Sequence, residues 1–357
     1  MAQSQTKSHL VTGGCGFVGR HLVNRLIKQG KSIWIIDDLS TGLHPTKWLP
    51  EKFRLIKHQA NVYIYQNKKQ KITFVKDDAI RFFSQQLGLG NFTRAHHLPN
   101  FSNVFHLASV VGGRAKIEGN PMAVAIDLAI DASFFLWATQ NKQKIDRVLY
   151  ASSSAAYPIN LQAKKRALAL KEKYIQFNIN LGQPDMTYGW SKLTGEYLSQ
   201  IAVEKYGLKV ACVRPFSGYG EDQDLTYPIP AIAERVARRD DPVVIWGSGD
   251  QGRDFVHIED CIDAMLLAIQ KITDGSGINI GSGKITTFKE VAQMYAEIAG
   301  YKPQIKPLVD KPTGVYSRYA DINYMRKKLN WVPKISLQEG LTRVLMMAQK
   351  KLGRDLS

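Results

Sequence analysis

The stretch SHLVTGGCGFVGRHLVNRLIKQGKSIWIIDD, residues 8–38, contains two short apolar runs separated by a glycine-rich turn and a longer amphipathic segment. Short apolar runs bounded by glycine or aspartate are typical of buried strands, and the apolar spacing of residues 17–30 is typical of a helix. The order strand, glycine turn, helix, strand predicts a parallel β–α–β unit. Similar strand and helix patterns follow this unit along the chain, so it indicates the fold of the whole N-terminal part.

Three glycines in this turn, Gly13, Gly16 and Gly19, are spaced three residues apart. The first permits a tight turn, the second lets a pyrophosphate approach the backbone at a helix N-terminus, and the third lets helix pack on strand. Asp37 ends the second strand, where a carboxylate meets the ribose hydroxyls of a bound dinucleotide. Since a carboxylate there repels a 2′-phosphate, the sequence predicts NAD as cofactor. The similar GSGDQG at 247–252 precedes a strand-like segment, and we interpret it as a loop.

Short apolar runs alternate with helical patterns as far as Arg214. This alternation predicts a parallel sheet with helices on both faces, that is, a Rossmann-type, doubly wound α/β fold. Beyond Arg214, Pro/Gly-rich loops and short helices indicate a smaller, substrate-binding α/β region. We therefore predict an NAD-binding domain at 1–216 and a mainly substrate-binding region at 217–357, interleaved with the first. Two segments, 43–72 and 159–183, look like insertions to which the sequence assigns no role.

The chain of 357 residues has a formal net charge of +17. Such a charge attracts polyanions, but lysines dispersed over a solvated surface produce the same total. The second interpretation is favoured, because the densest basic clusters are not interleaved with the aromatic residues that stack on bases in single-strand binders. We therefore expect no nucleic-acid partner.

Signals for targeting, disulfides and metals are weak. The N-terminal residues hold no long apolar run, so we expect no signal peptide. No stretch is expected to be long enough to span a membrane; the most apolar segment, 121–140, carries Asp127 and Asp131 and is interpreted as a buried helix, with no membrane partner. The three cysteines lie far apart without a CxxC pair, which argues against a disulfide framework or a metal site and favours a reducing, cytoplasmic location.

A second chemical pattern lies in TYGWSK, where Tyr188 and Lys192 are four residues apart and share one helix face. An ammonium beside a phenol favours the phenolate, so such a tyrosine can take the proton of a substrate hydroxyl. Tyr65 and Tyr324 also precede a lysine by four residues, but we interpret both as packing or exposed tyrosines. Only Tyr188 follows a serine-bearing strand end, YASSSAAYP at 150–158, by about 30 residues.

The motifs TGGCGFVG, DDLSTG, FHLAS, YASSSAAYP, YGWSK, RPFSGYG and GRDFVHIEDC occur in this order in the chain. From about residue 8 to about residue 345 the chain resembles the extended short-chain dehydrogenase/reductase family, and within it the NAD-dependent nucleotide-sugar epimerases. It looks closest to the GDP-mannose 3,5-epimerase and GDP-fucose synthase branch. The resemblance implies an enzyme with a nucleotide-diphosphate sugar as substrate. It also implies a homodimer in which 121–140 and the Tyr188 helix form a four-helix interface.

The resemblance assigns cofactor and catalytic residues. It implies that NAD is held by Gly13, Gly16, Phe17, Val18, Gly19, Asp37, Asp38, Asp78, Ala108, Tyr188 and Lys192. Asp78 is the residue expected near adenine. The catalytic residues are then Tyr188, Lys192 and Ser153. Ser153 is chosen because it lies four residues before Tyr157, the spacing that the family shows. Ser152 and Ser154 remain open alternatives to Ser153.

The resemblance also assigns substrate residues. Arg253, in GRDFVHIED, and Arg318, in GVYSRYADI, are expected to pair with the nucleotide diphosphate, because guanidinium forks match its oxygens. Ser217 stands in RPFSGYG where the family usually has asparagine. Ser217 is therefore our candidate for the substrate contact that the family's asparagine makes, and whether a serine makes this contact stays open.

The serine motif lacks the acidic and cysteine residues that relatives use for other reactions, and this absence indicates the type of reaction. Family dehydratases place an Asp–Glu pair there, and the 3,5-epimerase branch places a cysteine two residues after the serine, where this chain has Ala155. With serine, tyrosine and lysine, the simplest reaction is transient oxidation of a sugar carbinol, most often at C4, and hydride return to its other face. The alternative is a GDP-sugar 3,5-epimerase or keto-sugar reductase whose acid–base group is Lys116 or His257. A non-catalytic NAD-binding sensor is a remote alternative.

Overall fold

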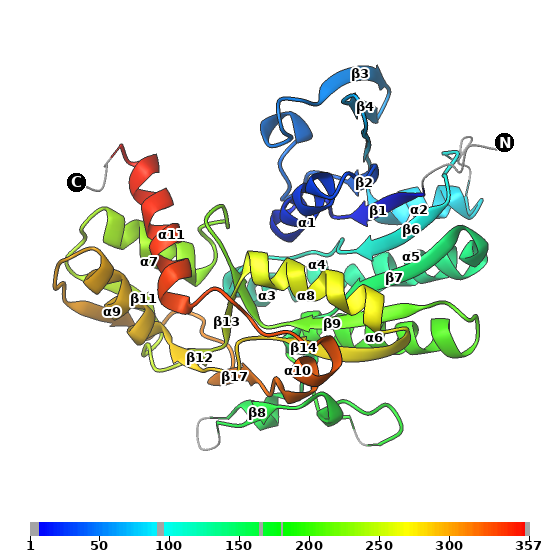
Figure 1. The fold of residues 1–357 in the computed structure, drawn as a ribbon. Coiled ribbons are helices and arrows are strands. Elements are labelled where there is room, and N and C mark those ends of the chain that lie inside the picture. Colours follow the sequence, from blue (N-terminus) through cyan, green and yellow to red (C-terminus); the bar gives the residue numbers. More distant parts are fainter. Residues whose placement is uncertain (1–6, 91–95, 164–166, 180, 354–357) are drawn as a thin grey trace.

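The computed structural model describes residues 7–90, 96–163, 167–179 and 181–353. Its centre is a nine-stranded sheet with the order β14-β9-β7-β6-β1-β2-β5-β4-β3 (Figure 1). The strands are β1 (Ser8–Thr12), β2 (Ile33–Asp37), β3 (Arg54–Gln59), β4 (Val62–Gln66), β5 (Lys71–Lys76), β6 (Phe101–His106), β7 (Ile145–Ala151), β9 (Val210–Pro215) and β14 (Asp274–Ile280). Neighbours from β14 to β5 are parallel, whereas β4 is antiparallel to both β5 and β3.

Helices cover both faces of this sheet. They are α1 (Phe17–Lys28) and α8 (Ile258–Lys271) on one face, and α2 (Ala79–Gln86), α5 (Asp127–Gln140) and α6 (Met186–Glu204) on the other. The short α10 (Asn323–Leu329) packs on α8 and β14. The predicted doubly wound α/β fold is therefore confirmed.

The direction of strand order reverses between β1 and β6. From β1 the chain builds one side of the sheet through β2 and β5, and the other side through β6, β7, β9 and β14. In open parallel sheets, ligands bind beyond the carboxyl ends of the strands at such a reversal. The glycine turn follows β1 and the FHLAS motif ends β6, so the fold brings both motifs to this point.

The apolar segment 121–140 forms two helices instead of the predicted single one. They are α4 (Pro121–Val124) and α5, joined by a turn at residues 125–126. By length and composition this segment could cross a membrane, so the expectation that no stretch is long enough is wrong. Core helices of soluble proteins pass the same test, and α5 buries Phe134 and Trp137 completely or nearly so within the core that covers the sheet.

In the smaller region, the described residues form three short sheets and, besides α8 and α10, three further helices. The sheets pair β10 (Ser217–Tyr219) with β13 (Phe255–His257), β11 (Val243–Trp246) with β16 (Ile305–Leu308), and β15 (Thr286–Thr287), β12 (Gly252–Arg253), β17 (Ser317–Ala320) and β8 (Ala169–Leu170) in that order. The helices α7 (Pro228–Ala237), α9 (Phe288–Ile298) and α11 (Leu337–Lys351) pack together. GSGDQG leads directly into the short strand β12, which starts at its last glycine, and not into a helix, so its interpretation as a loop is confirmed. Because β14 is a strand of the large sheet and α8 packs on that sheet, the domain boundary at residue 216 stays a prediction.

Segment 43–72 supplies the antiparallel edge of the large sheet. Its two strands, β3 and β4, form a hairpin that extends the sheet beyond β5 (Figure 1). All six residues of β3 are exposed. The hairpin is thus an addition to the far edge of the sheet, on the β2 and β5 side of β1.

Candidate active site

Two glycines of the turn, Gly13 and Gly19, lie too close to other backbone atoms to be replaced by a residue with a side chain. Gly13 has φ of +68°, and a Cβ there would lie 2.9 Å from the backbone nitrogen of Ala108 at the end of β6. A Cβ on Gly19 would lie 2.1 Å from the carbonyl oxygen of Gly13. Gly16 is the N-cap residue of α1, which also contains Phe17 and Val18. This turn, with the amide groups of the α1 N-terminus, fits a dinucleotide pyrophosphate.

Asp37 points back into the glycine turn. One carboxylate oxygen accepts a hydrogen bond from the backbone nitrogen of Cys15 and the other from that of Leu39, both at 2.8 Å. Burial raises the pKa of this carboxyl group, against the effect of the backbone donors. A carboxylate offers about four acceptor positions, so the backbone donors Cys15, Leu39 and Gly16 leave acceptor capacity for a ribose hydroxyl. The backbone amides thus fix the carboxylate beside the glycine turn, and its contact with NAD stays a prediction.

Two other predicted cofactor residues use their carboxylates within the protein. Asp38 accepts a hydrogen bond from the backbone nitrogen of Ser40 at 2.8 Å. Asp78 caps α2 by accepting from the backbone nitrogen of Arg81 at 3.0 Å. The preceding residue, Asp77, donates its backbone N–H to the carbonyl of Asp37, so the β2 and β5 ends lie together. The adenine contact of Asp78 stays a prediction.

Replacing Asp37 with alanine should weaken NAD binding and reduce any preference for NAD over NADP. The loss of one or two charge-assisted hydrogen bonds corresponds to about 1.5–3 kcal/mol each. Titration of cofactor-free protein with NAD and NADP measures both effects. The control is Asp146→Ala, because Asp146 is half-exposed in β7 near its amino end and pairs with Lys7. Tighter binding of NADP than of NAD by the unmodified protein would contradict the assignment.

The three adjacent serines after β7 have different surroundings. Ser152 is buried and donates to the buried carboxylate of Glu196 on α6. Ser154 is also buried. Ser153 is half-buried, and its hydroxyl oxygen accepts from the backbone nitrogen of Ala155 at 3.1 Å, so its own O–H can still donate. The geometry therefore favours Ser153 over both neighbours as the serine that meets a substrate.

The first turn of α6 lies against this serine turn. The backbone nitrogen of Asp185 donates to the carbonyl of Ala155 at 3.0 Å, and a Cβ on Gly189 would lie 2.5 Å from the same oxygen. Tyr188 is in this first turn. One turn later, Lys192 Nζ lies 5.8 Å from the centre of the Tyr188 ring. The fold thus brings the predicted tyrosine, lysine and serine to one place.

Lys192 is buried beside two carboxylates that the sequence did not assign to the site. Burial by itself lowers the pKa of Lys192, but the charges of Asp131 and Asp127 on α5 outweigh it and raise the pKa. Asp131 is held by the hydroxyl of Tyr150, which donates to it at 2.6 Å, and by His106 at 3.0 Å. Lys192 therefore keeps its positive charge next to Tyr188.

The other two tyrosines with a lysine four residues later lie elsewhere. Tyr65 is in strand β4 and is buried in the core beneath α1. Tyr324 is exposed on α10. Both fit the packing or exposed role predicted for them.

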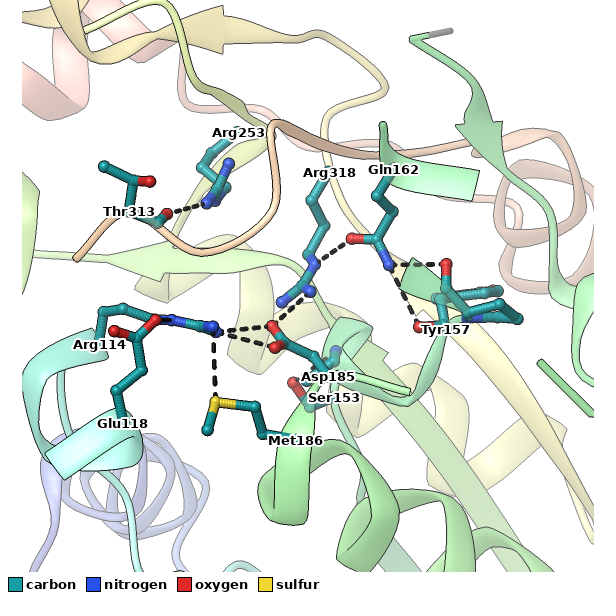
Figure 2. Close-up of polar contacts among 12 residues, drawn as sticks. Arg114, Glu118, Ser153, Tyr157, Gln162, Asp185, Met186, Arg253, Thr313 and Arg318 are labelled. Atoms are coloured by element: carbon teal, nitrogen blue, oxygen red, sulfur yellow. Dashed lines mark hydrogen bonds and ion pairs between the residues drawn. The ribbon is translucent and has the colours of Figure 1, made fainter. Parts of the chain in front are cut away.

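Arg253 and Arg318 are direct neighbours in the small sheet. They are register partners in the parallel strands β12 and β17. Arg253 donates to the carbonyl of Thr313 at 3.0 Å, and Arg318 donates to the carboxylate of Asp185 at 2.7 Å (Figure 2). The pKa of Arg253 is lowered to about 9, mainly by burial and to a smaller extent by the positive charge of Arg318. Two adjacent cations that lack full compensation are suited to bind an anion such as a diphosphate.

Arg114 was missed by the sequence analysis. It begins α3 (Arg114–Gly119), and its Nη1 donates to both oxygens of Asp185, at 2.8 and 3.0 Å, from the side opposite Arg318 (Figure 2). The charges of Arg318 and Arg114 overcome the effect of burial and lower the pKa of Asp185. Arg114, Asp185 and residues 310–315 line a pocket of about 620 Å³. Nothing in the sequence around Arg114 marked it as a site residue, and only its contact with Asp185 in space indicates a role.

The remaining candidates are less open to a substrate. His257 is buried; its Nδ1 accepts from the backbone of Glu259 to cap α8, and its Nε2 lies 3.3 Å from Glu221. Ser217 begins β10 and its backbone nitrogen donates to Asp254, so its substrate contact stays a prediction. The side chain of Lys116 lies outside the described residues. Within the described ranges, no three His, Cys, Asp or Glu side chains are grouped to hold a metal.

Comparisons with known proteins place the chain in a family. The model of the NAD dependent epimerase/dehydratase family matches residues 9–281. A putative UDP-glucose 4-epimerase of Methanocaldococcus jannaschii is 28% identical over 94% of this chain and 96% of its own length. GDP-mannose 3,5-epimerase of Arabidopsis thaliana is 26% identical, over 93% of this chain and 79% of that protein. A crystal structure of Thermotoga maritima UDP-glucose 4-epimerase with UDP-glucose superposes with a TM-score of 0.76 and 25% identity, covering 97% and 99% of the two chains.

Proposed function

We propose that this chain, which belongs to the NAD dependent epimerase/dehydratase family, is a nucleotide-sugar epimerase that inverts one carbinol carbon of the sugar, C4 in the first instance. The observation that carries this proposal is the meeting of Ser153, Tyr188 and Lys192 beside a turn that fits NAD. Beside the serine, Ala155 is buried and can move no proton. The similarity to two UDP-glucose 4-epimerases supports the choice of C4.

The residues have distinct tasks in this reaction. Tyr188 removes the proton of the sugar hydroxyl and later returns it, while the buried positive charge of Lys192 lies beside its ring and offsets the negative charge that the reaction develops there. Ser153 donates a hydrogen bond to the reacting sugar oxygen and holds it in line. Bound NAD supplies the acceptor and donor of the carbon-bound hydrogen. Arg253 and Arg318 bind the diphosphate, so that the sugar can present either face without leaving the protein.

The similarity to GDP-mannose 3,5-epimerase supports a second candidate, proton exchange at C3 and C5. That reaction needs an acid and a base at the neighbouring carbons. Ala155 supplies neither, and the His257 ring is used within the protein. The simpler inversion is therefore preferred.

The proposal is tested by incubating the protein and NAD with UDP-, GDP- and dTDP-hexoses and reading the products by NMR. We expect one sugar nucleotide to reach an equilibrium mixture of two epimers that differ at a single carbon. Failure to convert any of these sugars, with NAD bound, would contradict it.

We also propose a homodimer formed by the helices α4, α5 and α6, and action in a reducing compartment such as the cytoplasm, since all three cysteines are free and buried. No membrane or nucleic-acid partner is part of this proposal.

The dimer is supported by large apolar side chains that remain exposed on these helices and on the turn between α4 and α5, namely Met122, Ile126, Leu128, Leu136, Trp190 and Tyr197. A symmetric contact between two copies would cover them as a four-helix bundle.

The dimer should dissociate when a charge is placed in this patch. Trp190→Glu is expected to sediment as a monomer at micromolar concentration, because the contact would have to bury its carboxylate. Val309→Glu is the matched control, since Val309 is 70% exposed outside these helices. A wild-type protein that sediments only as a monomer would contradict the proposal.

A further inference from the structure

Segment 159–183, which looked like an insertion without a role, lies against the strand that carries Arg318. Its strand β8 pairs in parallel with β17, with Ala169 opposite Tyr319 and Leu170 opposite Ala320. The carbonyl of Leu170 also accepts from the backbone nitrogen of Asp321 at 2.9 Å. The segment therefore completes the small sheet in which Arg253 and Arg318 are neighbours.

Gln162, in the first turn of this segment, joins Arg318 to the serine turn. Its side-chain oxygen accepts from Arg318 Nε at 2.6 Å. Its side-chain nitrogen donates to the carbonyls of Tyr157 and Pro158, at 3.2 and 3.1 Å (Figure 2). Gln162 is only 1% exposed, so all three bonds lie within the protein. One side chain thus links the turn that presents Ser153 to one of the two paired arginines.

We infer that Gln162 is a positioning residue, which aims the Arg318 guanidinium at the diphosphate of the sugar nucleotide. This inference rests on the proposed function, because Arg318 binds a diphosphate only if the substrate is a sugar nucleotide. Among the described residues, Gln162 and Asp185 occupy Nε and Nη2 of Arg318 and leave Nη1 for an anion.

Gln162 is better suited to this task than a second carboxylate. An arginine side chain loses much rotamer freedom when it binds, and a partner that fixes it beforehand removes that cost from binding. Asp185 also fixes Arg318, but its negative charge repels the diphosphate. The neutral amide of Gln162 holds the guanidinium plane without this repulsion. Since the same amide is fixed by the serine turn, the diphosphate end and the reacting end of the substrate keep a set spacing.

The test is a double-mutant cycle on nucleotide affinity. Calorimetry with UDP and with GDP gives the dissociation constant for the NAD-loaded wild type, Gln162→Leu, Arg318→Ala and the double variant. We expect each single variant to lose about tenfold or more in affinity, because a hydrogen bond to a charged group is removed or its partner misplaced. The double variant should bind no more weakly than Arg318→Ala, because Gln162 acts through the arginine. With the cognate sugar nucleotide, Gln162→Leu should raise KM more than it lowers kcat.

Gln70→Leu is the matched control. Gln70 is also a buried glutamine whose side-chain nitrogen bridges two carbonyls, but these belong to Ile27 at the end of α1 and to Lys31 in the loop before β2, away from the arginines. The Gln70→Leu variant should be less stable than the wild type but should bind UDP and GDP with unchanged affinity. If Gln162→Leu does not fold, Gln162→Met replaces it, because methionine keeps a similar shape and removes the same polar groups.

The outcomes separate the inference from the function on which it rests. Unchanged affinity in Gln162→Leu, or losses that add in the double variant, would overturn the positioning role while leaving Arg318 as a diphosphate ligand. Unchanged affinity in Arg318→Ala would overturn both the positioning role and that ligand assignment, although conversion of sugar nucleotides could still be observed.

Discussion

Replacing Tyr188 with phenylalanine is expected to lower kcat by about 10²–10⁴-fold, the usual contribution of general acid–base catalysis. The phenyl ring keeps the packing of α6 but cannot accept or return the proton of the sugar hydroxyl. The dissociation constant of the nucleotide sugar should stay near that of the wild type, because the arginines of the small sheet are untouched. Steady-state kinetics and calorimetry on the same preparations separate the two quantities.

Tyr324→Phe is the control for this experiment. Tyr324 also precedes a lysine by four residues, but it is exposed on α10 and should be replaceable without effect on kcat. Wild-type turnover in Tyr188→Phe would show that another group is the catalytic base. A large fall in affinity with unchanged kcat would instead make Tyr188 a binding residue.

The second large effect is expected on stability. Glu196 and Arg214 form a buried ion pair at 2.6 Å, directly beneath the serine turn, and Ser152 donates to the same carboxylate. Burial by itself lowers the pKa of Arg214, but the Glu196 charge raises it well above its usual range. Glu196→Ala leaves the guanidinium buried and uncompensated, which typically costs about 3–5 kcal/mol of unfolding free energy.

Urea unfolding monitored by fluorescence measures this loss. Glu204→Ala is the matched control, since Glu204 is an exposed glutamate at the end of the same helix, and its replacement should change stability by about 0.5 kcal/mol or less. A loss of similar size in both variants would contradict the special contribution of the buried pair.

The parts of the site that the sequence predicted are local in the chain. The glycine turn lies within seven residues, and Tyr188 and Lys192 are one helical turn apart, so spacing alone determines their geometry. The strand and helix alternation likewise predicted the parallel sheet. The choice among the three serines was not local in this sense, because it depends on which hydroxyl the distant Glu196 takes.

The parts that the sequence did not predict depend on contacts between distant residues. Arg114 and Asp185 are 71 residues apart, and Gln162 and Arg318 are 156 apart. No spacing rule relates such pairs, and single arginines and glutamines are common on protein surfaces. The split of 121–140 into α4 and α5 was missed for a related reason, since an apolar pattern does not show where a helix is interrupted.

In the proposed reaction the sugar is inverted by oxidation and reduction at one carbon, without proton exchange at carbon. Turnover in D₂O tests this claim directly, with the sugar product examined by NMR and mass spectrometry. We predict inversion at a single carbon with almost no deuterium in the ring, because the carbon-bound hydrogen never meets solvent and Ala155 cannot deliver a proton. Substantial deuterium at C3 or C5 would contradict the account and would instead indicate proton exchange by a second acid–base group.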